Sequence, residues 1–389
     1  MKGRSPRVLL ALGWYDHRLH RGIERYAQEH GWHLHGDPGR ERTVPWGWDG
    51  DGILAWLSGN DELADFVACA RKPAVDFSSQ RPQLKIPRVL EDNAGAARMV
   101  ASHFLSRGLR KFLFYADSKS WVQEERGNGF RLALAAVGHD AVSLNWIQSP
   151  EFRSNRNSWR AKRKWLVREI QRAARPVGIF AATDGLACEV VEACETAGLR
   201  IPEEVAIVGA GNSLLAVEAM TMAVSSVDTN REALGYRGAQ QLDRLLHRLP
   251  VSAFPVRVPP SRLIVRRSSD LIAVANPGIA RSLHFLLEHG HESIGVKDLA
   301  RAAAMSVRKY HEVFVHHLGR TPGAQIHSFR VEKAKQLLIG SDKKMTDIAE
   351  ECGYQSSGGL WAAFKQALGI SPREFRARNG DEARTCLST

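Results

Sequence analysis

The 389-residue sequence lacks the features that mark several classes of protein. No stretch approaches the eighteen consecutive apolar residues of a membrane-spanning helix, which argues against a membrane protein of the helical type. Three basic residues precede a short apolar run in the first fourteen positions, but the run is too short for a signal peptide and no small-x-small cleavage site follows. We therefore expect a cytoplasmic protein whose N-terminal segment forms a buried strand.

Cysteine is scarce, and motifs of catalysis are missing. The five cysteines are Cys69, Cys188, Cys194, Cys352 and Cys386, without any CxxC spacing. Such a set favours reduced thiols over a disulfide framework or a zinc site. No GxSxG, P-loop or HExxH motif is present, so we predict no cofactor, no metal and no enzymatic activity.

What the sequence does contain is an ordinary globular composition with a basic balance. Hydrophobic residues make up 44% and charged residues 25%, and the length allows two or three domains. The net charge of +12 favours a polyanionic partner. Residues 278–389 hold 16 Lys and Arg against 12 Asp and Glu, a net of +4, which leaves +8 for the rest. Charge alone therefore does not locate a nucleic-acid-binding region.

Two segments near the C-terminus repeat each other at an offset of fifty residues. FVHHLGRTP at 314–322 and FKQALGISP at 364–372 share Phe, Leu, Gly and Pro. In each, a glycine ends a helical pattern, and Thr-Pro or Ser-Pro opens the next helix. A short helix, a break and a longer helix are predicted ahead of each ending, at 296–304 with 307–318 and at 345–353 with 356–368. Both copies are helix-turn-helix patterns.

A single helix at 322–340 is predicted to join the two units. At 1.5 Å per residue it would be roughly 28 Å long, which is near the ~34 Å of one DNA turn. The spacing indicates two recognition helices on one face of a duplex, and a plain helical bundle is the alternative. Residues 278–378 resemble the AraC/XylS-type DNA-binding domain over its whole length, including RVEKAKQLL at 330–338 and GISPREFR at 369–376. The resemblance implies a transcription regulator.

The outward faces of the two longer helices supply the candidates for DNA contact. In the first, Arg308 can pair with guanine, Glu312 can accept from cytosine, and His311 lies beside them. The family usually has a basic residue where Glu312 stands, so we expect a different half-site. The second helix exposes Ser357, Gly358, Gly359, Trp361 and Ala362, and the phosphate candidates are Lys309, Lys343, Lys344 and Lys365. This second helix could still contact thymine methyls or bring its backbone close to phosphates. We expect it to position the protein on the DNA more than to select the base sequence.

Residues before 270 alternate between strands and helices, which indicates parallel sheets with helices on both faces. Strands are predicted at 7–13, 32–36, 50–57, 74–78, 111–116, 177–182, 205–209 and 262–267, with a further strand at Val89, and helices at 18–30, 61–71, 93–107, 125–137, 159–174, 185–197 and 232–249. Ligands of such sheets bind outside the carboxyl ends of the strands. Two sheets facing each other would enclose a cleft.

Residues 7–268 resemble the periplasmic-binding-protein-like effector domain of LacI-type repressors. The resemblance is carried by VLEDNAGAA at 89–97, RGNGF at 126–130, FAATD at 180–184 and GLRIPEEVAIVG at 198–209. It implies a two-lobed α/β effector domain at 1–269, a linker at 270–278, and an all-α DNA-binding domain at 279–389. A LacI-like sensor joined to an AraC-like reader implies a sugar-responsive activator of pentose, xylose-type, catabolic genes. Its expected partners are operator DNA, a sugar, a second copy in a homodimer, and RNA polymerase.

A sugar site needs polar groups for hydroxyls and an aromatic face for the ring. By the resemblance, Arg126 and Asp184 take effector-contacting positions. Asp16 and Asp92 follow strands and are candidate hydroxyl acceptors. For these two residues and for Asp184, capping of the next helix is the alternative. Asn212 is a further candidate.

Some features leave the ligand and the function open. Gly211 stands where the family usually has an acidic residue, which leaves the identity of the sugar open. Trp14, at the mouth of the first strand, and Trp121 and Trp159, expected in loops, are candidates for stacking, with core packing as the alternative. The basic run at 153–175 favours a solvated helix. A solute-binding protein, or a regulator that responds to a different carbohydrate, remains the alternative function.

Overall fold

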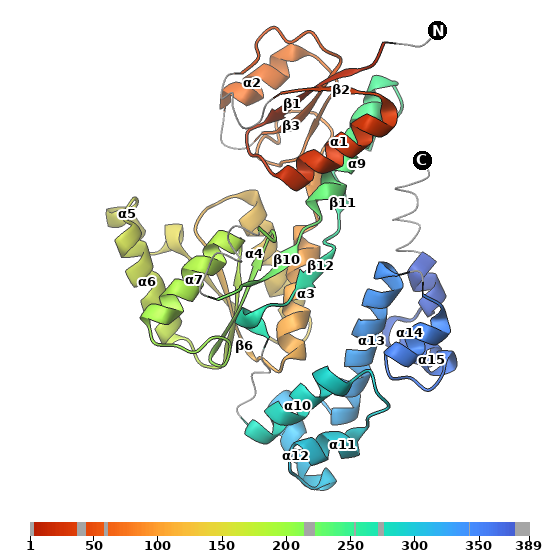
Figure 1. The fold of residues 1–389 in the computed structure, drawn as a ribbon. Coiled ribbons are helices and arrows are strands. Elements are labelled where there is room, and N and C mark those ends of the chain that lie inside the picture. The colour runs from red at the N-terminus through yellow and green to blue at the C-terminus, as the bar shows by residue number, and fades with distance from the viewer. Residues whose placement is uncertain are drawn as a thin grey trace.

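The computed structural model describes residues 4–36, 44–57, 61–213, 222–252, 254–270, 276–341 and 343–377. Two α/β lobes come first, and a helical region follows them (Figure 1). The fold class expected from the sequence is confirmed. Most of the expected linker at 270–278 lies outside the described residues, and Cys386 lies outside them too. Helix α10 (Pro277–His289) begins at the second-last position of the expected linker.

The first lobe is built on a parallel four-stranded sheet with the order β2-β1-β3-β4. Its elements are β1 (Arg7–Leu12), β2 (His33–His35), β3 (Gly52–Trp56), β4 (Ala74–Asp76), α1 (His17–His30), α2 (Asp61–Ala70) and α9 (Arg231–Leu246). Helices α1 and α9 touch through glycine: a Cβ added to Gly22 would overlap the carbonyl of Glu232, and one added to Gly235 would overlap that of Leu19. This close crossing brings a segment from residue 231 onward back to the first lobe.

The second lobe holds a six-stranded sheet with the order β12-β10-β9-β8-β6-β7. Its strands are β6 (Lys111–Ala116), β7 (Ala141–Asn145), β8 (Val177–Ala181), β9 (Val205–Ala210), β10 (Ser225–Asp228) and β12 (Arg262–Ile264), of which only β12 is antiparallel among the described strands. Its helices are α3 (Asn93–Ser106), α4 (Trp121–Ala135), α5 (Phe152–Asn155), α6 (Trp159–Arg172) and α7 (Asp184–Thr196). Between the lobes, β5 (Val89–Glu91) pairs in parallel with β11 (Val256–Val258).

Several predicted boundaries in this half were wrong. Strands β7, β10 and β11 were missed because they are short and are defined by pairing with neighbours rather than by their own pattern. The expected strand at 262–267 stops at Ile264, and a 3₁₀ turn covers Arg267–Ser269. Helix α4 begins at Trp121, four residues early, because Ser120 caps it. Trp121 is therefore the first residue of a helix, and the prediction that it lies in a loop was wrong. Trp159 is the first residue of α6, as the predicted helix at 159–174 has it, and does not lie in a loop.

The helical region confirms the repeat. Its helices are α10, α11 (Val296–Ala302), α12 (Val307–Leu318), α13 (Pro322–Gly340), α14 (Met345–Glu351) and α15 (Ser357–Leu368). Gly319 and Gly369 both adopt the left-handed conformation that ends α12 and α15, with φ of 66° and 71°. One core surrounds Phe314 and the other Phe364, and α13 contributes apolar residues to both. The two helix-turn-helix units are thus tied to one rod. None of the described helices is long and apolar enough to cross a membrane.

Candidate effector site and DNA-reading helices

Glu91 lies at the centre of a charged cluster between the two lobes. Its carboxylate accepts hydrogen bonds from Arg231 Nε at 3.0 Å, from Arg126 Nη2 at 2.8 Å and from Thr229 Oγ1 at 2.7 Å. Arg231 belongs to α9 of the first lobe and Arg126 to α4 of the second, so one carboxylate pairs with a cation from each side. Burial alone would raise the pKa of Glu91, but the charges of Arg231 and Arg126 outweigh burial and hold that pKa below its usual value.

Asp16 extends the cluster into the first lobe. It follows β1 and caps α1 by accepting from the backbone N–H of Arg18, so the capping alternative is confirmed. The same carboxylate also pairs with the side chains of Arg18 at 2.8 Å and Arg231 at 2.9 Å. Burial opposes ionisation, yet the hydrogen bonds and charges of Arg18 and Arg231 lower the pKa of Asp16 well below its usual range. The capping residue is therefore also a charged group facing the lobe junction.

Trp14 stacks over the same cluster. The Arg231 guanidinium carbon lies 4.7 Å from the centroid of the Trp14 ring, and Trp56 lies against that ring with a centroid distance of 4.8 Å. The Trp14 side chain remains 38% exposed, whereas Trp56 is buried. The exposed part of the Trp14 side chain adds apolar surface beside the charges, as a sugar site requires.

Asp184 lies where the ends of β8, β9 and β10 meet beside the cluster. It is the first residue of α7, whose cap is Thr183, so the capping alternative for Asp184 was wrong. Its carboxylate accepts from Ser226 Oγ at 2.5 Å and from the Ser213 N–H at 2.7 Å, and burial raises its pKa. The backbone carbonyl of Asn212 accepts from Arg18 at 3.1 Å.

Gly211 is dictated by this crowding. Its φ of +123° suits glycine, and a Cβ there would lie 3.3 Å from Asp184 Oδ2 and 3.2 Å from Arg231 Nη2. An acidic side chain at this position would have to share the space that Asp184 and Arg231 occupy. The positive φ and the nearness of the Asp184 carboxylate both disfavour an acidic residue at position 211.

Five of the six predicted effector residues gather at the carboxyl ends of the strands: Trp14, Asp16, Arg126, Asp184 and Asn212. Asp92 caps α3 by accepting from Gly95 N–H at 2.8 Å and pairs with Arg98 at 3.3 Å. None of the contacts described for Asp92 reaches the other five, so its capping alternative describes it best.

The sequence interpretation missed Glu91 and Arg231. Glu91 stands inside the VLEDN segment that carried the family resemblance, and that segment was the available signal. Arg231 had no such signal, because it follows β10, which was itself not predicted. Arg126 was expected to contact the effector directly, but it is 1% exposed and also donates to Asn93 and to the Ala182 carbonyl. In this arrangement it holds the cluster together from beneath.

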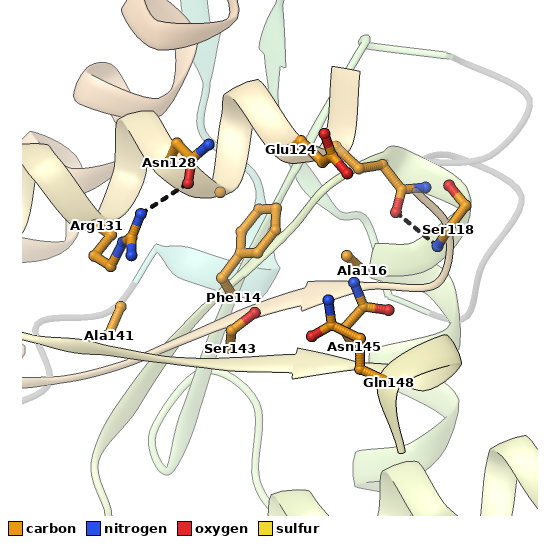
Figure 2. Close-up of a pocket in the computed structure, with 12 residues that line it drawn as sticks. Phe114, Ala116, Ser118, Glu124, Asn128, Arg131, Ala141, Ser143, Asn145 and Gln148 are labelled. Atoms are coloured by element: carbon orange, nitrogen blue, oxygen red, sulfur yellow. Dashed lines mark hydrogen bonds between the residues drawn. The ribbon is translucent and has the colours of Figure 1, made fainter. Parts of the chain in front are cut away.

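A separate pocket of about 300 Å³ lies in the second lobe between α4 and the edge strand β7 (Figure 2). Phe114 lies at its centre, with Asn128, Arg131, Ser143 and Asn145 around it. None of the six predicted effector residues lines this pocket.

The predicted DNA-contacting residues lie where a duplex could reach them. Arg308, Lys309, His311 and Glu312 are exposed on α12, and Ser357, Gly358, Gly359, Trp361 and Lys365 are exposed on α15. Arg308 Nε lies 3.4 Å from Glu312 Oε1, so these two side chains pair with each other in the absence of bases. Lys343 pairs with Glu351 at 2.6 Å, and Lys365 lies 3.7 Å from Glu374, so neither of these two phosphate candidates is free of an acidic neighbour.

Comparison with known proteins agrees with this division of the chain. A model of the periplasmic binding protein-like domain matches residues 101–269, and a model of the helix-turn-helix domain matches residues 299–378. The chain is 27% identical to the xylose operon regulatory protein of Escherichia coli (strain K12) over 343 residues, which are 86% of each chain. It is 32% identical to the transcriptional activator RhaS of Escherichia fergusonii over 117 residues, 29% of this chain and 42% of the other.

The solved structures include a match over nearly the whole chain. The structure of the xylose-binding transcription activator XylR is similar with a TM-score of 0.61 and 26% identity, covering 97% of this chain and 100% of the other. The cellobiose complex of the regulator CelR shares the fold of the two lobes, with a TM-score of 0.53, 21% identity and coverage of 68% and 85%. The chain therefore joins a periplasmic binding protein-like domain to a helix-turn-helix domain, and over most of its length it is similar to the xylose operon regulators.

Proposed function

We propose that the protein is a sugar-responsive transcription activator of pentose catabolic genes, with a sugar of the xylose type as its effector. The observation that carries this proposal is the charged cluster of Asp16, Arg231, Glu91 and Arg126, which spans both lobes of a domain fused to paired helix-turn-helix units. Carboxylates and guanidinium groups in this setting can exchange their mutual pairing for the hydroxyls of a sugar, while Trp14 covers its apolar face.

Helix α3 offers a route from this cluster to the DNA-reading helices. At its first residue, Asn93 accepts from Arg126 at 2.9 Å. At its other end, the carbonyls of Leu105 and Ser106 accept from Arg320 at 3.0 Å and Gln325 at 3.3 Å, at the junction of α12 and α13. A sugar that favours one arrangement of the lobes would therefore shift the first helix-turn-helix unit, by as much as its affinity differs between the two arrangements.

The unit of action is a homodimer in this proposal, and RNA polymerase is its further partner. Each chain presents two DNA-reading helices, and one of them has few hydrogen-bonding side chains. A second copy of the chain would therefore be needed to raise the total affinity for DNA. The cell compartment that suits a DNA-binding regulator is the cytoplasm.

A different carbohydrate is the second candidate for the effector. Gly211 offers no carboxylate to a hydroxyl, whereas the family usually has an acidic residue there. This difference affects specificity and leaves the regulatory function unchanged.

Calorimetric titration of the full chain with a panel of pentoses and hexoses tests the effector. We expect heat of binding with a pentose; heat with a hexose only would favour the second candidate, and no heat with any sugar would refute the effector assignment. Gel shifts on the DNA upstream of its gene test the DNA-binding function of the helix-turn-helix units. Arg308→Ala should weaken binding by ~1–3 kcal/mol, or roughly 5- to 150-fold, while the matched control Arg301→Ala, on the exposed face of α11, should not.

A further inference from the structure

The fifty-residue repeat makes α12 and α15 comparable position by position. Ser306 and Ser356 cap the two helices in the same way, and Phe314 and Phe364 are buried at matching positions. The outward positions differ completely. Where α12 exposes Arg308, Lys309, His311 and Glu312, α15 exposes Gly358, Gly359, Trp361 and Ala362.

The two glycines of α15 are not needed by the fold. Neither has a positive φ. A Cβ added to Gly358 would meet only Ser356 Oγ at 3.6 Å, and one added to Gly359 would have Tyr354 Cδ1 as its nearest neighbour at 3.7 Å, both ordinary contacts. Alanine would fit at either position and would favour the helix more than glycine does. The missing side chains therefore affect only what approaches the helix from outside.

Trp361 stands next to this bare stretch of helix. Its side chain is 52% exposed, and Lys365 Nζ lies 6.0 Å from its ring centroid. Lys344 and Arg373 of the same unit are also exposed, and neither pairs with an acidic group among the described residues. An exposed apolar ring with a lysine beside it suits a groove floor bordered by phosphates.

On the basis of the proposed function, we infer that Trp361 reads thymine in the half-site of α15. The C5 methyl of thymine is the apolar group that the major groove offers. Gly358 and Gly359 let the helix backbone lie deep in the groove, which brings the ring to the methyl edge. The second unit then selects its bases by apolar contact, whereas α12 selects by hydrogen bonds. This refines the expectation that α15 only positions the protein.

Replacement of thymine by uracil tests the inference, because it removes the methyl and keeps the base pair. The duplex is selected from random sequences by the full chain, and uracil then replaces thymine in one half-site at a time. A methyl removed from water is worth roughly a fourfold change in affinity. We expect the wild type to lose about that factor per contacted methyl in one half-site. Trp361→Ala should bind the thymine and uracil duplexes equally.

Two further variants complete the test. Trp46→Ala is the matched control, because Trp46 is 55% exposed in the first lobe, and it should leave affinity and methyl discrimination unchanged. Gly359→Ala should raise the melting temperature of the helical region and weaken DNA binding; unchanged or tighter binding would overturn the close approach.

The outcomes separate this inference from the proposed function. Equal binding of both duplexes by the wild type, or discrimination that persists in Trp361→Ala, would overturn the role of Trp361 while specific DNA binding stands. Failure of the unmodified chain to select any sequence would overturn both.

Discussion

Glu91→Gln is the substitution that most directly tests the charged cluster. The change keeps the shape of the side chain and removes the negative charge that pairs with both Arg231 and Arg126. A glutamine can accept from one of these guanidinium groups, but its NH₂ group would then face the other. Removal of one partner from a buried ion pair costs ~3–5 kcal/mol. For a domain of this size that corresponds to a drop of roughly 6–15 °C in melting temperature.

The pH dependence gives this prediction its sign. The folded-state pKa of Glu91 is lowered, so the stability that its charge contributes is fully present above the unfolded pKa of 4.5. That contribution is lost as the pH falls through the lower folded pKa. The gap in stability between the wild type and Glu91→Gln should therefore be full near neutral pH and should shrink below the unfolded pKa.

Thermal unfolding followed by calorimetry is the suitable assay, because the helical region should melt as in the wild type and serves as an internal reference. Glu192→Gln is the matched control, since the Glu192 carboxylate forms a solvent-exposed pair with Arg163 at 3.7 Å and its loss should shift stability by no more than ~0.5 kcal/mol. A Glu91→Gln protein as stable as the control at neutral pH would refute the reasoning. A gap that did not change with acidification would refute its electrostatic origin.

Three other predictions follow from buried groups and close contacts. Burial raises the pKa of Asp76 from 3.8 to about 6, so the free energy of unfolding should fall by ~3 kcal/mol in total as the pH rises through this window. Denaturant titrations of Asp76→Asn should show no such fall. A fall that persists in this variant would contradict the assignment. Gly235→Ala should destabilise the first lobe by at least ~1–3 kcal/mol, because its Cβ would overlap the Leu19 carbonyl. The control Gly185→Ala, whose Cβ meets only Thr183 Oγ1 at 3.9 Å, should melt at the wild-type temperature or above it. Equal melting of both variants would contradict the packing argument. Arg320→Ala should leave sugar affinity in calorimetry unchanged but alter the effect of sugar on DNA affinity by about 1 kcal/mol, or roughly fivefold; Arg160→Ala on α6 is the control, and an unchanged sugar effect in Arg320→Ala would exclude this contact as the route.

Much of this protein was determined locally and could be predicted from its sequence. The alternation of strands and helices depends on the spacing of apolar residues along a few turns. The ends of α12 and α15 depend on Gly319 and Gly369, which adopt the left-handed conformation without the help of distant residues. The repeat of fifty residues then predicts that both units bury the same positions.

The tertiary structure alone decided how the charges are paired. Arg231 reaches Glu91 across 140 residues of sequence, and Arg320 reaches the Leu105 carbonyl across 215. Strand β10, which precedes Arg231, exists because β9 and β12 pair with it. Sequence patterns report on a residue and its near neighbours in the chain. The partner of a buried charge depends instead on how distant strands and helices pack together. For this reason the sequence located Asp16 and Arg126 but could not identify Arg231 and Glu91 as the ion pair that joins them.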